Sequence, residues 1–329
     1  MRMRFIALLL SIPLLSVALL PGVLQAQTLP SIEELTLTVS PQYPRPYDTV
    51  TATVSSNQLD LAAGAITISV NGTVVSEGER SATFTLGGPG TKATIVATVK
   101  DAAGTHSATR VLSSADVALV QEASSTVPPF YKGGKLPASQ GTVRLIALTN
   151  FQTAAGTQIA PQNLSFTWKL GDQVLMSDSG LGKNVLTAVA PVRYRDARVS
   201  VTISTQDKSL SAQASTLVSP VDPIMRIYRH DPLQGIDLSR ALSGIFAMTN
   251  DEETFRAVPY YYASPPTLGW SLNSADSGSN PDITVRTTGS TKGSALLGAR
   301  AAAAGVTNNA EARLTVQFGE NRSTGLFGL

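Results

Sequence analysis

The 329-residue sequence has no cysteine and only two histidines, His106 and His230. The absence of cysteine excludes disulfides, thiol catalysis, cysteine-ligated zinc and iron–sulfur clusters. Two isolated histidines offer little for a histidine-rich metal site or a catalytic triad, so we expect no cofactor. Charged residues make up 15% and aromatic residues 6%, whereas 43% are hydrophobic. This composition is not typical of a disordered chain, and we expect folded domains.

Residues 1–26 have the pattern of a secretory signal. Arg2 and Arg4 precede an apolar run over residues 5–20, and the segment ends at the small residue Ala26. This order predicts export to the periplasm, the cell surface or the extracellular space, with cleavage after Ala26. The alternative is an uncleaved membrane anchor, because residues 5–24 are just long enough to span a bilayer.

Removal of the signal changes the charge balance. The sequence has 25 basic and 23 acidic residues, and Arg2 and Arg4 belong to the signal. The mature chain is therefore neutral, with 23 charges of each sign. A neutral chain without a basic stripe does not favour nucleic-acid binding.

The mature chain is rich in short, alternating Val, Ile and Thr runs, which predict an all-β fold. Asn71-Gly72, between two such runs, predicts a tight hairpin. Period-2 alternation with one apolar face is typical of antiparallel sheets packed as a sandwich. In the first unit we expect seven strands, at residues 35–39, 48–54, 65–70, 73–75, 82–86, 92–99 and 107–112.

The pattern recurs after about 100 residues, which is typical of tandem domains of this size. Trp168 and Trp270, the only tryptophans, fall at matching places in the second and third repeats, where we expect them to mark the cores. The short joints between repeats, the second with two prolines, favour a semi-rigid rod. The predicted organisation is a signal at 1–26, Ig-like units at 31–115, 116–220 and 221–319, and a tail at 320–329.

With its signal, its ~100-residue β units and the tryptophan of the third strand, the chain resembles bacterial exported Ig-like modules, of the kind grouped with PKD or CARDB repeats. The resemblance covers residues 31–319 and implies a seven-stranded β-sandwich per unit. It also implies roles in surface architecture, adhesion or carbohydrate-associated display. The inter-sheet cysteine pair of a true Ig domain is missing.

Two aromatic clusters are the candidate binding residues. Tyr260, Tyr261 and Tyr262 form the densest cluster, and Phe130 and Tyr131 lie in a loop rich in proline and glycine. Exposed aromatic rings stack on sugars or anchor protein partners. The alternative is core or edge packing, since Tyr260 and Tyr262 face one side of a strand and Tyr261 the other.

Polar candidates are weaker. We expect His106 and the pair His230-Asp231 in exposed turns or loops, and residues 251–253, an acidic run, in a solvated loop. The segment over residues 273–282 has side-chain oxygens that could bind Ca²⁺, although their spacing is not that of an EF-hand. The alternative is an ordinary polar turn. The candidate Ca²⁺ ligands are Asp276, Asn280 and Asp282.

From these features we expect an exported, non-enzymatic rod for structural or adhesive display, with its recognition surface in the third unit. The expected partners are other surface proteins or glycans, and one alternative is a carbohydrate-binding accessory module. Another is a subunit of an exported filament, which would assemble through Leu326, Phe327 and Leu329.

Overall fold

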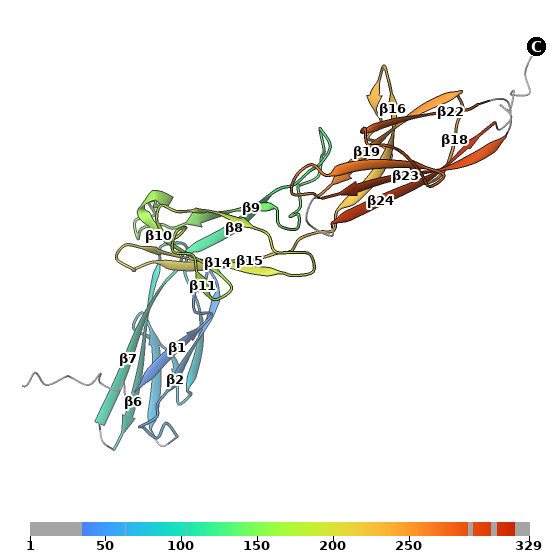
Figure 1. Ribbon diagram of the computed structural model, residues 1–329. Coiled ribbons are helices and arrows are strands. Elements are labelled where there is room, and N and C mark those ends of the chain that lie inside the picture. The colour runs from blue at the N-terminus through green and yellow to red at the C-terminus, as the bar shows by residue number, and fades with distance from the viewer. Residues whose placement is uncertain (1–34, 63, 103, 289–291, 304–307, 320–329) are drawn as a thin grey trace, which may run out of the picture.

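The computed structural model describes residues 35–62, 64–102, 104–288, 292–303 and 308–319. The signal at 1–26 and the tail at 320–329, with Leu326, Phe327 and Leu329, lie outside the described residues. The structure is a series of Ig-like antiparallel β-sandwiches, as the sequence predicts (Figure 1). No helix in the described part of the chain is long and apolar enough to span a membrane.

The first sandwich places a three-stranded sheet over a four-stranded one. One sheet has the order β1-β2-β5 and the other β4-β3-β6-β7. All seven strands lie where the alternating runs predict them, within a few residues at each end. Their bounds are β1 (Thr36–Ser40), β2 (Thr49–Ser55), β3 (Ala65–Val70), β4 (Thr73–Glu77), β5 (Ser81–Thr85), β6 (Lys92–Asp101) and β7 (Gly104–Ser113).

Alternation builds this sandwich locally. In β2, Val50, Ala52 and Val54 are buried while Thr49 and Ser55 are exposed, as a strand with one core face requires. The hairpin between β3 and β4 turns at Asn71 and Gly72, with φ of 53° and 83°. Two positive φ angles are what a type I′ hairpin turn needs, so the prediction of a hairpin is confirmed.

The second sandwich repeats this strand order. The sheets run β13-β9-β8 and β11-β10-β14-β15, with β12 beside β10. Trp168, Phe166 and Val201 are fully buried between them. The bounds are β8 (Asp116–Ser124), β9 (Thr142–Asn150), β10 (Leu164–Leu170), β11 (Gln173–Val174), β12 (Gly180–Leu181), β13 (Val185–Val189), β14 (Ala197–Thr205) and β15 (Ser211–Val218), with a 3₁₀ turn η1 (Pro161–Asn163).

The third sandwich has one additional feature. Its sheets run β17-β16-β19-β22 and β18-β24-β23-β20-β21. β18 pairs in parallel with β24, because the chain crosses from the first sheet to the edge of the second. The bounds are β16 (Ile224–Asp231), β17 (Gly235–Ile236), β18 (Gly244–Ala247), β19 (Glu252–Tyr260), β20 (Thr267–Leu272), β21 (Ala275–Gly278), β22 (Asp282–Arg286), β23 (Gly293–Ala302) and β24 (Asn309–Phe318).

The sandwiches follow one another end to end, and the molecule bends between the first and the second (Figure 1). At this bend the Gly90 N–H donates to the Ser114 carbonyl at 2.9 Å, and Ser114 is fully buried. A Cβ added at Gly90 would lie 2.6 Å from the Thr153 carbonyl oxygen. Glycine therefore allows a close approach between the first and second sandwiches.

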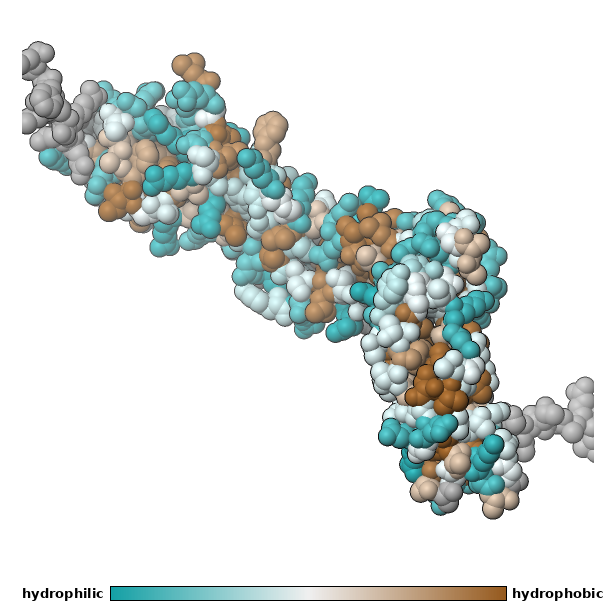
Figure 2. Space-filling view, turned by 180° about the vertical axis from the view of Figure 1, so that it is seen from behind, coloured by the Kyte–Doolittle hydropathy of each residue, from teal (hydrophilic) through white to brown (hydrophobic). Residues whose placement is uncertain are grey.

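Figure 2 shows one face of the molecule, on which apolar residues form separate patches along its length. Each sandwich has its own buried cluster, with Ile68 in the first, Trp168 in the second and Trp270 in the third. A fourth, smaller cluster contains Tyr228, Val258 and Tyr260. It also includes Val127 of the second sandwich, so it packs at the joint between the second and third.

Candidate functional site

The three consecutive tyrosines lie at the end of β19, where the third sandwich meets the second. Tyr260 is 8% exposed and Tyr262 is 2% exposed, whereas Tyr261 is half-buried. The Tyr262 hydroxyl donates to the Ala301 carbonyl at 3.1 Å inside the core. Tyr260 and Tyr262 therefore point to the buried side, as residues two positions apart on a strand do, and their rings are not exposed on the surface.

Tyr131, from the second sandwich, contacts this cluster. Its hydroxyl lies 2.8 Å from the Tyr261 hydroxyl, and its ring packs edge-on against Tyr260 at 5.8 Å between centroids. The Tyr260 hydroxyl in turn lies 2.6 Å from the Tyr228 hydroxyl in a buried pair. The structure thus brings the two predicted aromatic clusters together across a domain joint. We call Tyr131, Tyr228, Tyr260 and Tyr261 the tyrosine joint.

Backbone hydrogen bonds reinforce the tyrosine joint. The Tyr261 N–H donates to the Thr126 carbonyl at 2.7 Å, and the Thr126 N–H donates to the Tyr262 carbonyl at 2.8 Å. The Thr126 hydroxyl also accepts from the Tyr262 N–H at 3.0 Å. These bonds pair backbone groups of the second sandwich with backbone groups of the third.

A second attachment lies on the connecting segment itself. The Val221 N–H donates to the Pro137 carbonyl at 2.9 Å, and Ala138 forms a bridge with Val221. Arg193 adds an ion pair with Asp222 at 2.8 Å. The second and third sandwiches are therefore attached to each other at two separate places.

The three consecutive tyrosines keep their protons at neutral pH, because the pKa of each is raised. Burial raises the pKa of Tyr260 well above its ordinary value, and its bond with Tyr228 adds to the effect. The bond with Tyr131 raises the pKa of Tyr261 to about 12, and burial raises that of Tyr262 to about 12. Neutral phenols at these positions suit packing and hydrogen bonding rather than proton transfer.

Phe130 is the most exposed member of the predicted set. Its side chain is 97% exposed, next to Tyr131 at 37%, and its backbone has a φ of 59°. Lys132 and Lys135 are exposed in the same loop, and neither has an ion-pair partner among the described residues. An exposed aromatic ring beside unpaired cations is a suitable contact point for a partner.

The candidate cation ligands do not converge. Asp276 pairs with Arg300 at 3.6 Å, and the Asn280 carbonyl accepts from the Trp270 indole at 2.8 Å. Asp282 lies on β22, in the opposite sheet from the strand that holds Asp276. Within the described ranges, no group of three or more His, Asp and Glu residues could hold a metal ion. The structure therefore separates the predicted oxygen ligands.

Two polar expectations are corrected. His230 lies at the end of β16, and its Nδ1 is 2.9 Å from Asp282, which also pairs with Arg256 at 2.6 Å. Glu253, expected in a solvated loop, instead lies in β19 and is only 6% exposed. Its buried carboxylate accepts two hydrogen bonds from Arg229, at 3.0 and 3.1 Å. Both arrangements join strands of one sheet, and the residue spacing in the sequence gives no signal for them.

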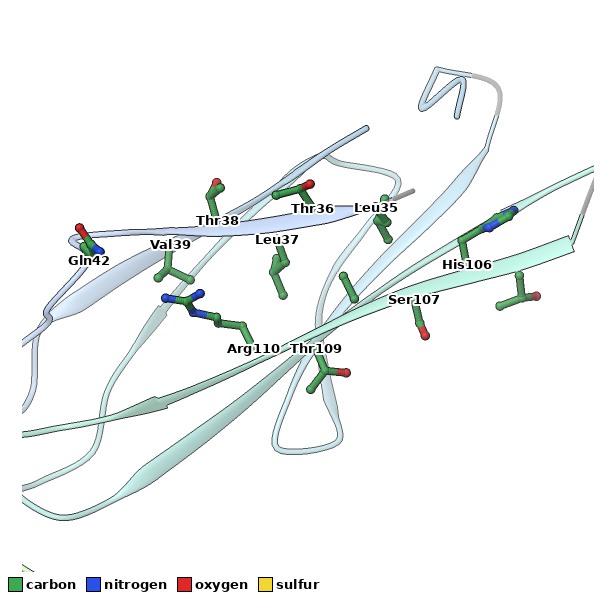
Figure 3. Close-up of a pocket in the computed structure, with 12 residues that line it drawn as sticks. Leu35, Thr36, Leu37, Thr38, Val39, Gln42, His106, Ser107, Thr109 and Arg110 are labelled. Carbon is green, nitrogen blue, oxygen red and sulfur yellow. The ribbon is translucent and has the colours of Figure 1, made fainter. Parts of the chain in front are cut away.

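A cleft of about 790 Å³ opens along one side of the first sandwich, between its first and last strands (Figure 3). Leu35, Leu37 and Val39 line it from β1 and the residue before it. His106, expected in an exposed turn, lines it from β7 and is half-buried, with Nε2 3.5 Å from Asp101. Nothing in the local sequence marks this cleft, because it depends on how far apart two edge strands lie.

Neither a protein-family model nor a curated protein matches the sequence. Among solved structures, the chain is similar to the three N-terminal domains of the highly immunogenic outer capsid protein (Hoc) of bacteriophage RB49. The identity is 13%, the match covers 86% of this chain and 98% of that chain, and the TM-score is 0.25.

It is also similar to fibronectin(III)-like modules of CbhA from Clostridium thermocellum. The identity is 9%, the match covers 56% of this chain and 94% of that chain, and the TM-score is 0.25. The central fibronectin-III array of RIM-binding protein matches with 8% identity and a TM-score of 0.28. This match covers 87% of this chain and 96% of that chain. The fold assignment rests on the strand order and the separate cores, not on these loose superpositions.

Proposed function

We propose that this protein is an exported, non-enzymatic rod that displays or spaces partners at a cell surface. The tyrosine joint is the observation that carries the proposal. A flexible linker would let successive sandwiches rotate freely, whereas here backbone bonds at Thr126 and at Val221 fix the second sandwich to the third. A rod of fixed shape suits a structural or adhesive role, in which the distance between attached ends matters.

Phe130 is the proposed adhesive contact on this rod. Its ring projects from the loop that supplies Tyr131 to the tyrosine joint, so the rigid joint also positions the exposed side chain. Preorganising a contact residue lowers the entropic cost of binding. The expected partner is another surface protein or a glycan that accepts an aromatic ring.

Rigidity can be tested by distance measurements between two spin labels. Because the chain has no cysteine, Ser215→Cys and Ser294→Cys introduce unique, exposed labelling sites on the second and third sandwiches. We expect one narrow distance distribution in the parent chain, which Tyr131→Ala broadens. Phe130→Ala is the matched control, since it removes a neighbouring ring that is 97% exposed.

A broad distribution in the parent chain, or no effect of Tyr131→Ala, would contradict the rigid-rod proposal. The location is tested separately by mass spectrometry of the surface fraction of the native host. A chain that begins at Gln27 in that fraction is the expected result, and a chain confined to the cytoplasm would overturn the display role.

A further inference from the structure

The cleft in the first sandwich lies between two strands whose outer edges are unpaired. β1 pairs only with β2, and β7 pairs only with β6, among the described residues. Val39 lines the gap from β1 (Figure 3), and Ala108 lines it from β7; both side chains are half-buried. Free edge backbone beside partly exposed apolar side chains is a template for an added strand.

The third sandwich shows how this side of the fold is closed. There β18 pairs in parallel with the last strand, β24, over Leu314–Gln317. Phe246 of β18 packs against the core and meets Phe255 edge-on at 5.3 Å, while Ile245 points outward and is 66% exposed. No strand occupies the corresponding place beside β7 in the described part of the first sandwich.

Residues 324–328 have the same pattern of residue types as the strand that closes the third sandwich, with glycine and phenylalanine identical. β18 and the residue before it read Ser-Gly-Ile-Phe-Ala over 243–247, and the tail reads Thr-Gly-Leu-Phe-Gly over 324–328. Both have a hydroxyl residue, glycine, a branched aliphatic residue, phenylalanine and a small residue in the same order. Because side chains alternate along a strand, Phe327 would point inward as Phe246 does, and Leu326 outward as Ile245 does.

The tail cannot reach the cleft of its own molecule. β24, which the tail follows, lies in the sandwich at the opposite end of the molecule from β1 and β7 (Figure 1). Ten extended residues span about 33 Å, which is roughly the length of one sandwich strand of nine or ten residues. The middle sandwich, with the nine-residue β8, lies between them. The donor must therefore be a second copy.

We propose that residues 324–328 of one molecule insert beside β7 of the next molecule, with Phe327 in the cleft. The contact is head-to-tail, because the donor segment and the acceptor cleft lie in different parts of the chain, and its repetition gives a linear filament. This assembly goes beyond the rod function, because a rod that stays monomeric could still act as a spacer.

Cross-linking tests the contact directly. One chain carries Gly328→Cys as donor and the other carries Thr109→Cys, which lies on β7 at the cleft. Ser215→Cys, exposed on the second sandwich, is the matched acceptor control. After the chains are mixed and oxidised, we expect several-fold more mixed disulfide with Thr109→Cys than with Ser215→Cys. Equal yields would overturn the proposal.

Sedimentation velocity over a concentration series gives an independent test with two tail variants. Chain 27–329 should associate increasingly with concentration, Phe327→Asp should abolish association, and Leu326→Asp should retain most of it. Both substitutions lie in the tail, outside the described residues, and a melting temperature equal to that of the parent chain shows that each variant is folded. A monomer at every concentration, or association that Phe327→Asp leaves unchanged, contradicts the filament but not the rigid rod, which the spin-label distances test.

Discussion

Trp168 and Trp270 occupy the same place in two successive sandwiches and satisfy their indole N–H groups in the same way. Trp168 donates to the Lys183 carbonyl at 2.9 Å, and Trp270 donates to the Asn280 carbonyl at 2.8 Å. Each lies on the strand that pairs with the penultimate long strand of its sandwich, opposite Val201 and Ala299. Both sandwiches therefore bury a tryptophan ring in the core while its indole N–H donates to a backbone carbonyl.

The two tryptophans allow the stability of each sandwich to be measured separately. Trp168→Ala should lower the unfolding free energy of the second sandwich by about 3–5 kcal/mol, since it leaves a large cavity and an unpaired carbonyl. The fluorescence of Trp270 then reports the third sandwich alone in a urea titration. We expect its midpoint to stay close to that of the parent chain. An equal shift at Trp270 would mean that the two sandwiches unfold as one unit.

The strands could be predicted from the sequence because their information is local. Alternation along β2 and the turn pair Asn71-Gly72 depend only on neighbouring residues, and both are found as expected. The core role of Trp168 and Trp270 also follows from the repeat, since a large aromatic ring at a matching strand position must be buried in both copies.

The role of the tyrosines could not be predicted because it depends on contacts between sandwiches. Tyr131 and Tyr261 are 130 positions apart, and neither local pattern shows that their hydroxyls meet. The same holds for Glu253, whose acidic neighbours suggest a solvated loop although Arg229 on the adjacent strand pairs with it. The cleft beside β7 likewise reflects the spacing of two edge strands, which composition does not encode.

Arg229 and Arg286 offer a matched comparison between a buried and an exposed carboxylate. Arg229 pairs with Glu253, whose side chain is 5% exposed, whereas Arg286 pairs with Glu252, whose side chain is 57% exposed. Arg229→Leu should destabilise the third sandwich by about 1–3 kcal/mol, because the buried Glu253 carboxylate then keeps only the hydrogen bond from the Asn250 side-chain amide. Arg286→Leu should change stability by no more than about 0.5 kcal/mol. Similar losses in urea unfolding would show that Glu253 is not effectively buried in solution.

Gly90 controls the approach of the first sandwich to the second. An alanine there would adopt a φ of 78° and would bring its Cβ to 2.6 Å from the Thr153 carbonyl oxygen. Gly90→Ala should therefore displace the joint and shift the distance between spin labels at Thr83→Cys and Ser215→Cys, both exposed. Gly156→Ala is the control, since Gly156 has a φ of 81° but no atom within 4 Å of an added Cβ. If both variants give the same distances, the contact at Gly90 does not set the bend.

The buried tyrosines make stability depend on pH at the alkaline end. Burial raises the pKa of Tyr262 to about 12 from an ordinary value of 10.0, so between these values the unfolded chain loses a proton that the folded chain keeps. The stabilisation is therefore fully present below pH 10 and is lost as the pH rises through about 12. We expect the urea midpoint of the third sandwich, followed by Trp270 fluorescence, to fall across this window. Tyr262→Phe should flatten the fall, whereas Tyr194→Phe, at a side chain 83% exposed, should not. An unchanged slope in Tyr262→Phe would show that other groups cause the alkaline loss.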